Sequence, residues 1–129
     1  MASAGLETAV ARELSGLLAA DQLITLPEQL RTYECDGLTS HRVVPALVAL
    51  PQSGEEVQAV VRACNTHGVP FVARGAGSGL SGGAVPVSDG VVISLARMTR
   101  IVSIDVDPPD PGDAVAIPPA EIDADAAVC

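Results

Sequence analysis

The sequence contains no lysine and no tryptophan, and only one tyrosine and one phenylalanine occur among its 129 residues. The missing lysine excludes a Walker-type phosphate loop and Schiff-base chemistry, because both need a lysine amine. The scarcity of aromatic rings and the net charge of −9 argue against nucleic-acid binding, which needs a basic patch and stacking platforms. No run of about 18 apolar residues is present, so the sequence predicts no membrane span.

Cysteine is also scarce: Cys35, Cys64 and Cys129 form neither an even set nor a Cys-x-x-Cys pair. A disulfide framework normally needs an even number of cysteines in a secreted chain. The sequence opens without a basic segment followed by an apolar run, so it predicts no secretory leader. These features favour a cytoplasmic protein with reduced thiols.

The charge is concentrated at one end of the chain. Residues 1–100 hold nine acidic residues and all seven arginines, whereas residues 101–129 hold seven acidic residues and no basic one. Five prolines also fall after residue 105. We therefore expect three parts: an N-terminal helix and lead-in over 1–42, a partial domain over 43–105, and a disordered acidic tail over 106–129.

Local patterns predict helices and strands in the first hundred residues. Residues 4–20 carry leucine and valine at helical spacing, which predicts an amphipathic helix. A βαβ unit follows: a strand over Ala46–Leu50, a helix that begins after Ser53 and ends at Gly68, and a strand over Val69–Ala73. Ser53 and Glu56 form a capping box, in which each side chain bonds the other residue's backbone amide. Further strands are expected over 91–95 and around 100–104.

A glycine-rich loop follows the second predicted strand. Five of residues 75–83 are glycine, which allows left-handed backbone angles and lets a ligand approach the main chain closely. Successive amides in such a loop form an anion-binding concavity. Arg74 adds positive charge, and Ser78 and Ser81 add hydroxyl donors. A plain connector of this composition would have a large ordering cost, so we interpret the loop as a phosphate or pyrophosphate cradle.

The loop also matches the dinucleotide fingerprint formally, through Gly77, Gly79 and Gly82. That fingerprint requires a helix to begin within the glycines, with its N-terminus facing the pyrophosphate. Here Pro86 and a turn at Asp89-Gly90 precede another strand, which leaves no room for a helix. The sequence therefore argues against a Rossmann fold.

No metal site or catalytic residue is predicted. Cys64 and His67 are spaced like zinc ligands, but no second pair accompanies them, so we expect a packed cysteine and a surface histidine. His41-Arg42 has no partner carboxylate or nucleophile at a meaningful spacing and is interpreted as a polar loop. The acidic residues of the tail lack the spacing of a calcium loop.

Four stretches resemble a known family: PALVALP at 45–51, SGEEVQAVV at 53–61, VPFVARGAGSGLSGGAVP at 69–86 and GVVISL at 90–95. They are similar to the FAD-binding domain of the vanillyl-alcohol oxidase / p-cresol methylhydroxylase type, the PCMH type. Within it, the similarity is greatest to the FAD-binding subunit of glycolate oxidase and to D-lactate dehydrogenases. YECDGL at 33–38 also resembles that subunit.

The resemblance implies an α+β fold, namely the first subdomain of a PCMH-type FAD-binding domain, incomplete in this chain. It implies FAD as cofactor, and Pro51 near it. It also implies removal of a hydride from a small 2-hydroxy acid to flavin N5. The loop residues that would bind the pyrophosphate through backbone amides are Arg74, Gly75, Ala76, Gly77, Ser78, Gly79, Leu80, Ser81, Gly82 and Gly83.

The sequence departs from the family after the 100–104 strand. The resemblance is expected to stop near Asp105–Asp107, which suggests a truncated or frame-shifted reading frame. We then expect an FAD-binding portion that is inactive alone. The sequence leaves open whether partner subunits complete the site. The alternative is a non-catalytic nucleotide- or phosphate-binding module, or an inert remnant.

Overall fold

The computed structural model describes residues 2–106 and 120–124. In these ranges two short 3-10 helices, η1 and η2, accompany three α-helices and six strands. Four strands form one sheet in the order β1-β2-β4-β3, and β5 pairs with β6 in a second sheet. The elements are α1 (Ala2–Leu17), η1 (Ala20–Gln22), β1 (Leu23–Ile24), α2 (Pro27–Leu30), η2 (Arg31–Tyr33), β2 (Leu47–Ala49), α3 (Gly54–His67), β3 (Phe71–Arg74), β4 (Val91–Ser94), β5 (Ile101–Val106) and β6 (Ala120–Ala124).

The predicted βαβ unit is present as β2, α3 and β3, but its two strands are not neighbours. Strand β4 lies between them and is parallel to both, whereas β1 runs antiparallel to β2 at the edge. All four residues of β4 are buried, while β3 alternates between exposed and half-buried positions. The two fully buried strands, β2 and β4, therefore occupy the interior of the sheet, and β3 forms the second edge.

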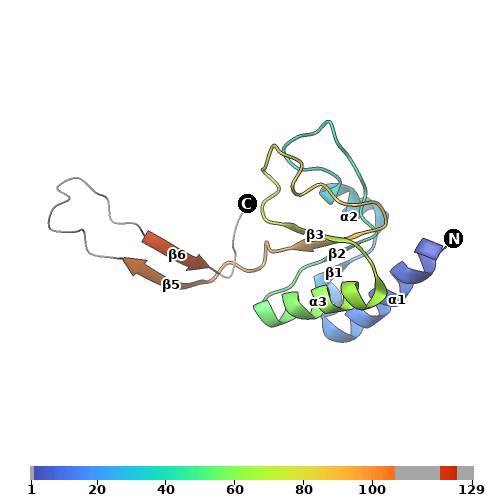
Figure 1. The fold of residues 1–129 in the computed structure, drawn as a ribbon, viewed down its shortest axis with the longest axis horizontal. Coiled ribbons are helices and arrows are strands. Elements are labelled where there is room, and N and C mark those ends of the chain that lie inside the picture. The colour runs from blue at the N-terminus through green and yellow to red at the C-terminus, as the bar shows by residue number, and fades with distance from the viewer. Residues whose placement is uncertain (1, 107–119, 125–129) are drawn as a thin grey trace.

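Helices cover both faces of this sheet (Figure 1). Leu47, Ala49, Val91 and Ile93 face a core shared with the buried side chains of α1 and α3. The alternate strand residues Val48 and Val92 pack with Leu30 of α2 on the opposite face. Because successive side chains of a strand point to opposite faces, two separate apolar clusters form, one on each face of the sheet.

The ends of α3 follow the predicted signals with one difference. Ser53 Oγ accepts a hydrogen bond from the Glu56 amide at 3.3 Å, and Gly68 ends the helix at a φ of 64°. The Glu56 carboxylate does not return to the Ser53 amide as the capping box predicted. It accepts instead from the Gln52 amide at 2.7 Å and from Gln22 Nε2 at 2.6 Å. A buried side chain from η1 thus completes the start of the helix.

The second sheet projects away from the first (Figure 1). Strand β5 covers the predicted strand around 100–104 and continues to Val106. Its antiparallel partner β6, Ala120–Ala124, lies in the segment that was expected to be disordered. The same expectation for 107–119 and 125–129 lies outside the described residues. No helix in the described part of the chain combines the length and apolar character needed to cross a bilayer.

Candidate functional site

The glycine-rich loop leaves the sheet at the carboxyl ends of its parallel strands. It begins at Arg74, the last residue of β3, and the Leu95 amide after β4 donates to the Arg74 carbonyl at 2.9 Å. In open sheets with parallel strands, ligands bind outside the carboxyl ends of the strands. The fold therefore places the loop at the end of the sheet where a ligand site is expected.

A cavity of about 600 Å³ lies along this loop. Seven of the ten predicted loop residues line it, and Ala76, Leu80 and Gly82 do not. The Leu80 side chain is 70% exposed, and Gly82 borders a smaller neighbouring hollow. The volume of the loop cavity falls within the range of small-molecule sites. The lining residues are Ala73, Arg74, Gly75, Gly77, Ser78, Gly79, Ser81, Gly83, Ala84 and Leu95.

The backbone of the loop suits close approach by a ligand. Gly77 and Gly82 have φ angles of 71° and 75°, in the left-handed region that favours glycine. A Cβ atom built on Gly79 or Gly83 would have no heavy atom within 4 Å, so open space adjoins the main chain at both positions. Backbone amides that border open space in this way can receive an anionic group such as a pyrophosphate.

Arg74 is anchored to a segment that the sequence analysis did not connect with the loop. Its Nη1 donates to the Cys35 carbonyl at 2.7 Å, and its guanidinium carbon lies 5.4 Å from the centroid of the Tyr33 ring. The Gly37 amide donates to the Gly79 carbonyl at 2.9 Å. Only the resemblance of residues 33–38 to the same family could have indicated this connection.

Pro51, the remaining predicted site residue, does not lie at the loop cavity. It is fully buried just beyond β2, and it is not among the residues that line the loop cavity. Strand β4 separates β2 from β3, so about two strand spacings of roughly 4.8 Å lie between the ends of these strands. The cofactor-contact role predicted for Pro51 stays a prediction.

The residues with zinc-like spacing serve other purposes. Cys64 is fully buried, and this burial raises the pKa of its thiol from 9.0 to about 11. His67 Nε2 lies 2.6 Å from Glu13 Oε2 and links α3 to α1. Within the described ranges no cluster of three or more His, Cys, Asp or Glu side chains could hold a metal ion.

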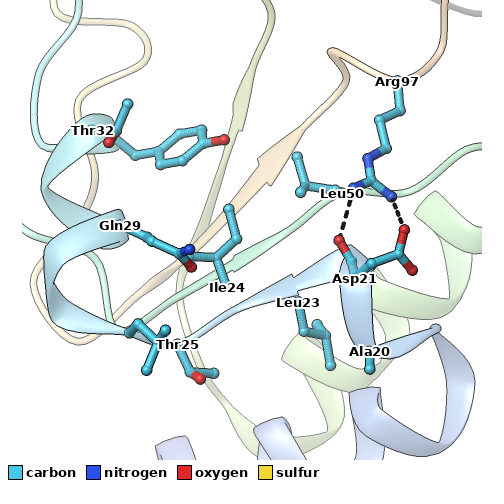
Figure 2. Close-up of a pocket in the computed structure, with 11 residues that line it drawn as sticks. Ala20, Asp21, Leu23, Ile24, Thr25, Gln29, Thr32, Leu50 and Arg97 are labelled. Carbon is cyan, nitrogen blue, oxygen red and sulfur yellow. Dashed lines mark hydrogen bonds and ion pairs between the residues drawn. The ribbon is translucent and has the colours of Figure 1, made fainter.

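A second hollow of about 620 Å³ lies beside β1 and α2 (Figure 2). Figure 2 shows Arg97 reaching across to Asp21, with Nη1 2.9 Å from Oδ2 and Nη2 2.8 Å from the backbone carbonyl. None of the predicted site residues lines this hollow. The predicted cradle and this hollow are therefore separate features.

Comparison with known sequences identifies the family. Residues 45–122, more than half of the chain, match the family described as the FAD binding domain. The chain belongs to this family, and the prediction of FAD as its cofactor is confirmed. The match extends past Asp105–Asp107 to residue 122, so the expectation that the resemblance stops near residue 105 is wrong.

Among curated relatives, the glycolate oxidase subunit GlcD of Escherichia coli K12 is 45% identical over 83 residues, which cover 64% of this chain and 17% of GlcD. The mitochondrial D-2-hydroxyglutarate dehydrogenase of Rattus norvegicus is 37% identical over 82 residues, 64% of this chain and 15% of that protein. The D-lactate dehydrogenase of Archaeoglobus fulgidus is 43% identical over 61 residues, 47% and 14% of the two chains. The match thus spans about a sixth of each relative's length.

Solved structures show the same fold. The 4-ethylphenol oxidase of Gulosibacter chungangensis has a TM-score of 0.70 at 26% identity, covering 79% of this chain and 20% of that one. A p-cresol methylhydroxylase has a TM-score of 0.67 at 28% identity, covering 78% and 20%. The predicted fold, part of a PCMH-type FAD-binding domain, is confirmed.

Proposed function

We propose that the chain is the pyrophosphate-binding portion of an FAD-dependent oxidoreductase that acts on small 2-hydroxy acids. The loop from Arg74 to Gly83 forms the pyrophosphate site through its backbone amides, and Pro51 contributes near the cofactor. FAD, when bound, supplies the hydride-accepting chemistry. The substrate class is proposed because glycolate, D-lactate and D-2-hydroxyglutarate appear in the names of the relatives.

The observation that carries this proposal is the cavity beside the loop, which is lined mainly by glycine and small side chains. Arg74 is the only charged residue in its lining, and none of residues 74–84 is acidic. Successive backbone amides beside open space, with one positive charge nearby and no acidic residue among them, favour an anionic ligand. The chain thus offers an anion site that suits the central part of FAD.

We further propose that the chain does not turn over substrate by itself. Its alignments cover only 14–17% of these three relatives. The cavity lining holds no histidine, carboxylate or cysteine that could act as a general acid or base. Glycolate- or lactate-dependent reduction of a dye by the isolated chain would contradict this part of the proposal.

Equilibrium titration of the purified chain tests the cofactor site. FAD and ADP share the pyrophosphate, whereas riboflavin lacks it. We expect FAD and ADP to bind and riboflavin to bind at least about tenfold more weakly. Equal binding of riboflavin and FAD would contradict a pyrophosphate site, and absence of FAD and ADP binding would contradict the proposed function as a whole.

A pair of glycine variants locates the site. Gly79→Ala adds a methyl group to open space in the cavity lining, whereas Gly16→Ala adds one to open space on α1. Neither methyl group meets a neighbouring atom, so neither should disturb the fold. We expect Gly79→Ala to weaken FAD binding about tenfold and Gly16→Ala to leave it unchanged. Equal affinities for the two variants would place the site elsewhere.

A further inference from the structure

We propose that Arg74 acts as a positioning residue, which holds the glycine-rich loop against the segment Tyr33–Gly37 from inside the protein, instead of binding phosphate directly. The consequence for pyrophosphate binding rests on the proposed function. We call this arrangement, in which Arg74 holds the loop against Tyr33–Gly37, the clamp. It consists of contacts within the chain, so it can be tested without a ligand.

The contacts of the Arg74 side chain are internal. Nη1 donates to the Cys35 carbonyl at 2.7 Å across 39 positions in sequence, and the guanidinium lies over the Tyr33 ring. A guanidinium presents its donors in a rigid plane, so fixing one donor on a carbonyl and one face on a ring restricts the whole group. Such a group is held in place to support the loop, and its donors are not all free for a ligand.

Gly77 shows that the loop is built around this guanidinium. A Cβ atom on Gly77 would overlap with Cζ and Nη2 of Arg74, and it would lie 2.8 Å from Nε. The absence of a side chain therefore lets the backbone at Gly77 rest directly against the arginine. The positive φ of 71° at the same residue also favours glycine.

Gly37, in the segment Tyr33–Gly37, forms a second close contact with the glycine-rich loop. Its amide donates to the Gly79 carbonyl at 2.9 Å, and a Cβ at Gly37 would lie 2.8 Å from the Ser78 carbonyl oxygen and 2.9 Å from that of Gly79. Asp36 shapes this turn, because its Oδ1 accepts from the Leu38 amide at 2.8 Å. Two glycines thus allow the segment and the loop to touch through their backbones.

This interlock orients the amides of the loop. The carbonyls of Ser78 and Gly79 lie toward Gly37. A trans peptide places its N–H opposite its C=O, so the amides of Gly79 and Leu80 point away from Gly37. Preorganised donors bind an anion more tightly than donors that must first be ordered. Arg74 contributes by keeping these peptide planes in a fixed orientation before any ligand arrives.

The test compares Arg74→Lys and Arg74→Met with a control, Arg97→Met. The control removes the two contacts of the Arg97 guanidinium with Asp21, which lie outside the loop. Two readouts need no flavin. One is amide hydrogen exchange of residues 75–83. The other is tyrosine emission, which reports Tyr33 alone because the sequence has no tryptophan and no second tyrosine. Flavin fluorescence then gives the affinity for FAD.

We expect both Arg74 variants to speed exchange of the loop about tenfold and to change the Tyr33 emission, because neither can reproduce the planar contacts of arginine. Both should weaken FAD binding by a similar factor. Arg97→Met should leave all three readouts unchanged. A direct phosphate ligand predicts a different result, since lysine also binds phosphate as a point charge.

Wild-type exchange and emission in Arg74→Met would overturn the clamp. Flavin-free readouts that match the wild type in Arg74→Lys, with FAD affinity retained in Arg74→Lys and lost in Arg74→Met, would assign Arg74 to phosphate binding and also overturn it. Failure of the wild-type chain to bind FAD would refute the proposed function, while the two flavin-free readouts would still decide the clamp.

Discussion

Alanine substitution in the glycine-rich loop gives a graded test of its geometry. Gly79→Ala places a methyl group in open space at a residue outside the left-handed region, so the free energy of unfolding should change by less than about 0.5 kcal/mol. Gly82→Ala places an alanine in the left-handed region. Its Cβ atom would lie 4.0 Å from Val85 Cγ2, which is ordinary van der Waals contact. A non-glycine residue in that conformation costs about 1 kcal/mol.

Gly77→Ala should have the largest effect of the three. It combines the same backbone cost, about 1 kcal/mol, with displacement of the Arg74 guanidinium. Losing the hydrogen bond from this charged group to the Cys35 carbonyl costs about 2 kcal/mol. We therefore expect unfolding to become easier by about 3 kcal/mol, measured by urea denaturation followed by far-ultraviolet circular dichroism without flavin.

A double-mutant cycle shows whether the guanidinium is responsible. In an Arg74→Ala background the overlap is gone, so Gly77→Ala should cost only the backbone strain of about 1 kcal/mol. The reasoning is refuted if Gly77→Ala costs the same in both backgrounds, or if the three single variants are equally stable.

Three further measurements test the core and its charges. Leu14→Ala should lower the free energy of unfolding by about 2–5 kcal/mol, because Leu14 is fully buried, while Leu17→Ala, at a position that is 49% exposed on the same helix, should cost under about 1 kcal/mol. Equal losses would contradict the packing of α1. Gln22→Ala should cost about 1–3 kcal/mol in the same urea assay, since Gln22 bonds the Leu50 carbonyl and Glu56, whereas exposed Gln58→Ala should be neutral. The pKa of Cys64 is about 11 when folded and 9.0 in the unfolded chain, so the unfolded thiol ionises first and stability should fall by about 2–3 kcal/mol between pH 9 and pH 11. Cys64→Ala should remove that part of the decline, and an unchanged slope would refute this origin.

Local signals predicted the main helices and strands well. The cap at Ser53 and the left-handed stop at Gly68 define α3 within a few residues, because both depend on backbone groups adjacent in sequence. The short elements β1 and α2 were not predicted. Two and four residues carry too little periodicity, and these elements exist because β1 pairs with β2 and Leu30 packs on Val48 and Val92.

The glycine-rich loop was predicted as the site because its composition is local and unusual. Its attachment could not be predicted from composition or spacing. Arg74 was expected to offer its charge to a ligand, and that stays a prediction; the structure adds that it bonds the Cys35 carbonyl and lies over Tyr33. These contacts join residues about 40 positions apart, and only the folded chain brings them together.

The sequence by itself determined the family, the cofactor and the loop that is proposed to carry the site, since each depends on residues that follow one another in the chain. The absence of lysine and the scarcity of aromatic residues already excluded several classes of phosphate and base recognition. Tertiary structure alone decided the strand order, with β4 between β2 and β3, and the pairing of β6 with β5. It also decided what lies behind the loop, because the contacts of Arg74 with Cys35 and Tyr33 join segments about 40 positions apart and leave no signal in a local pattern.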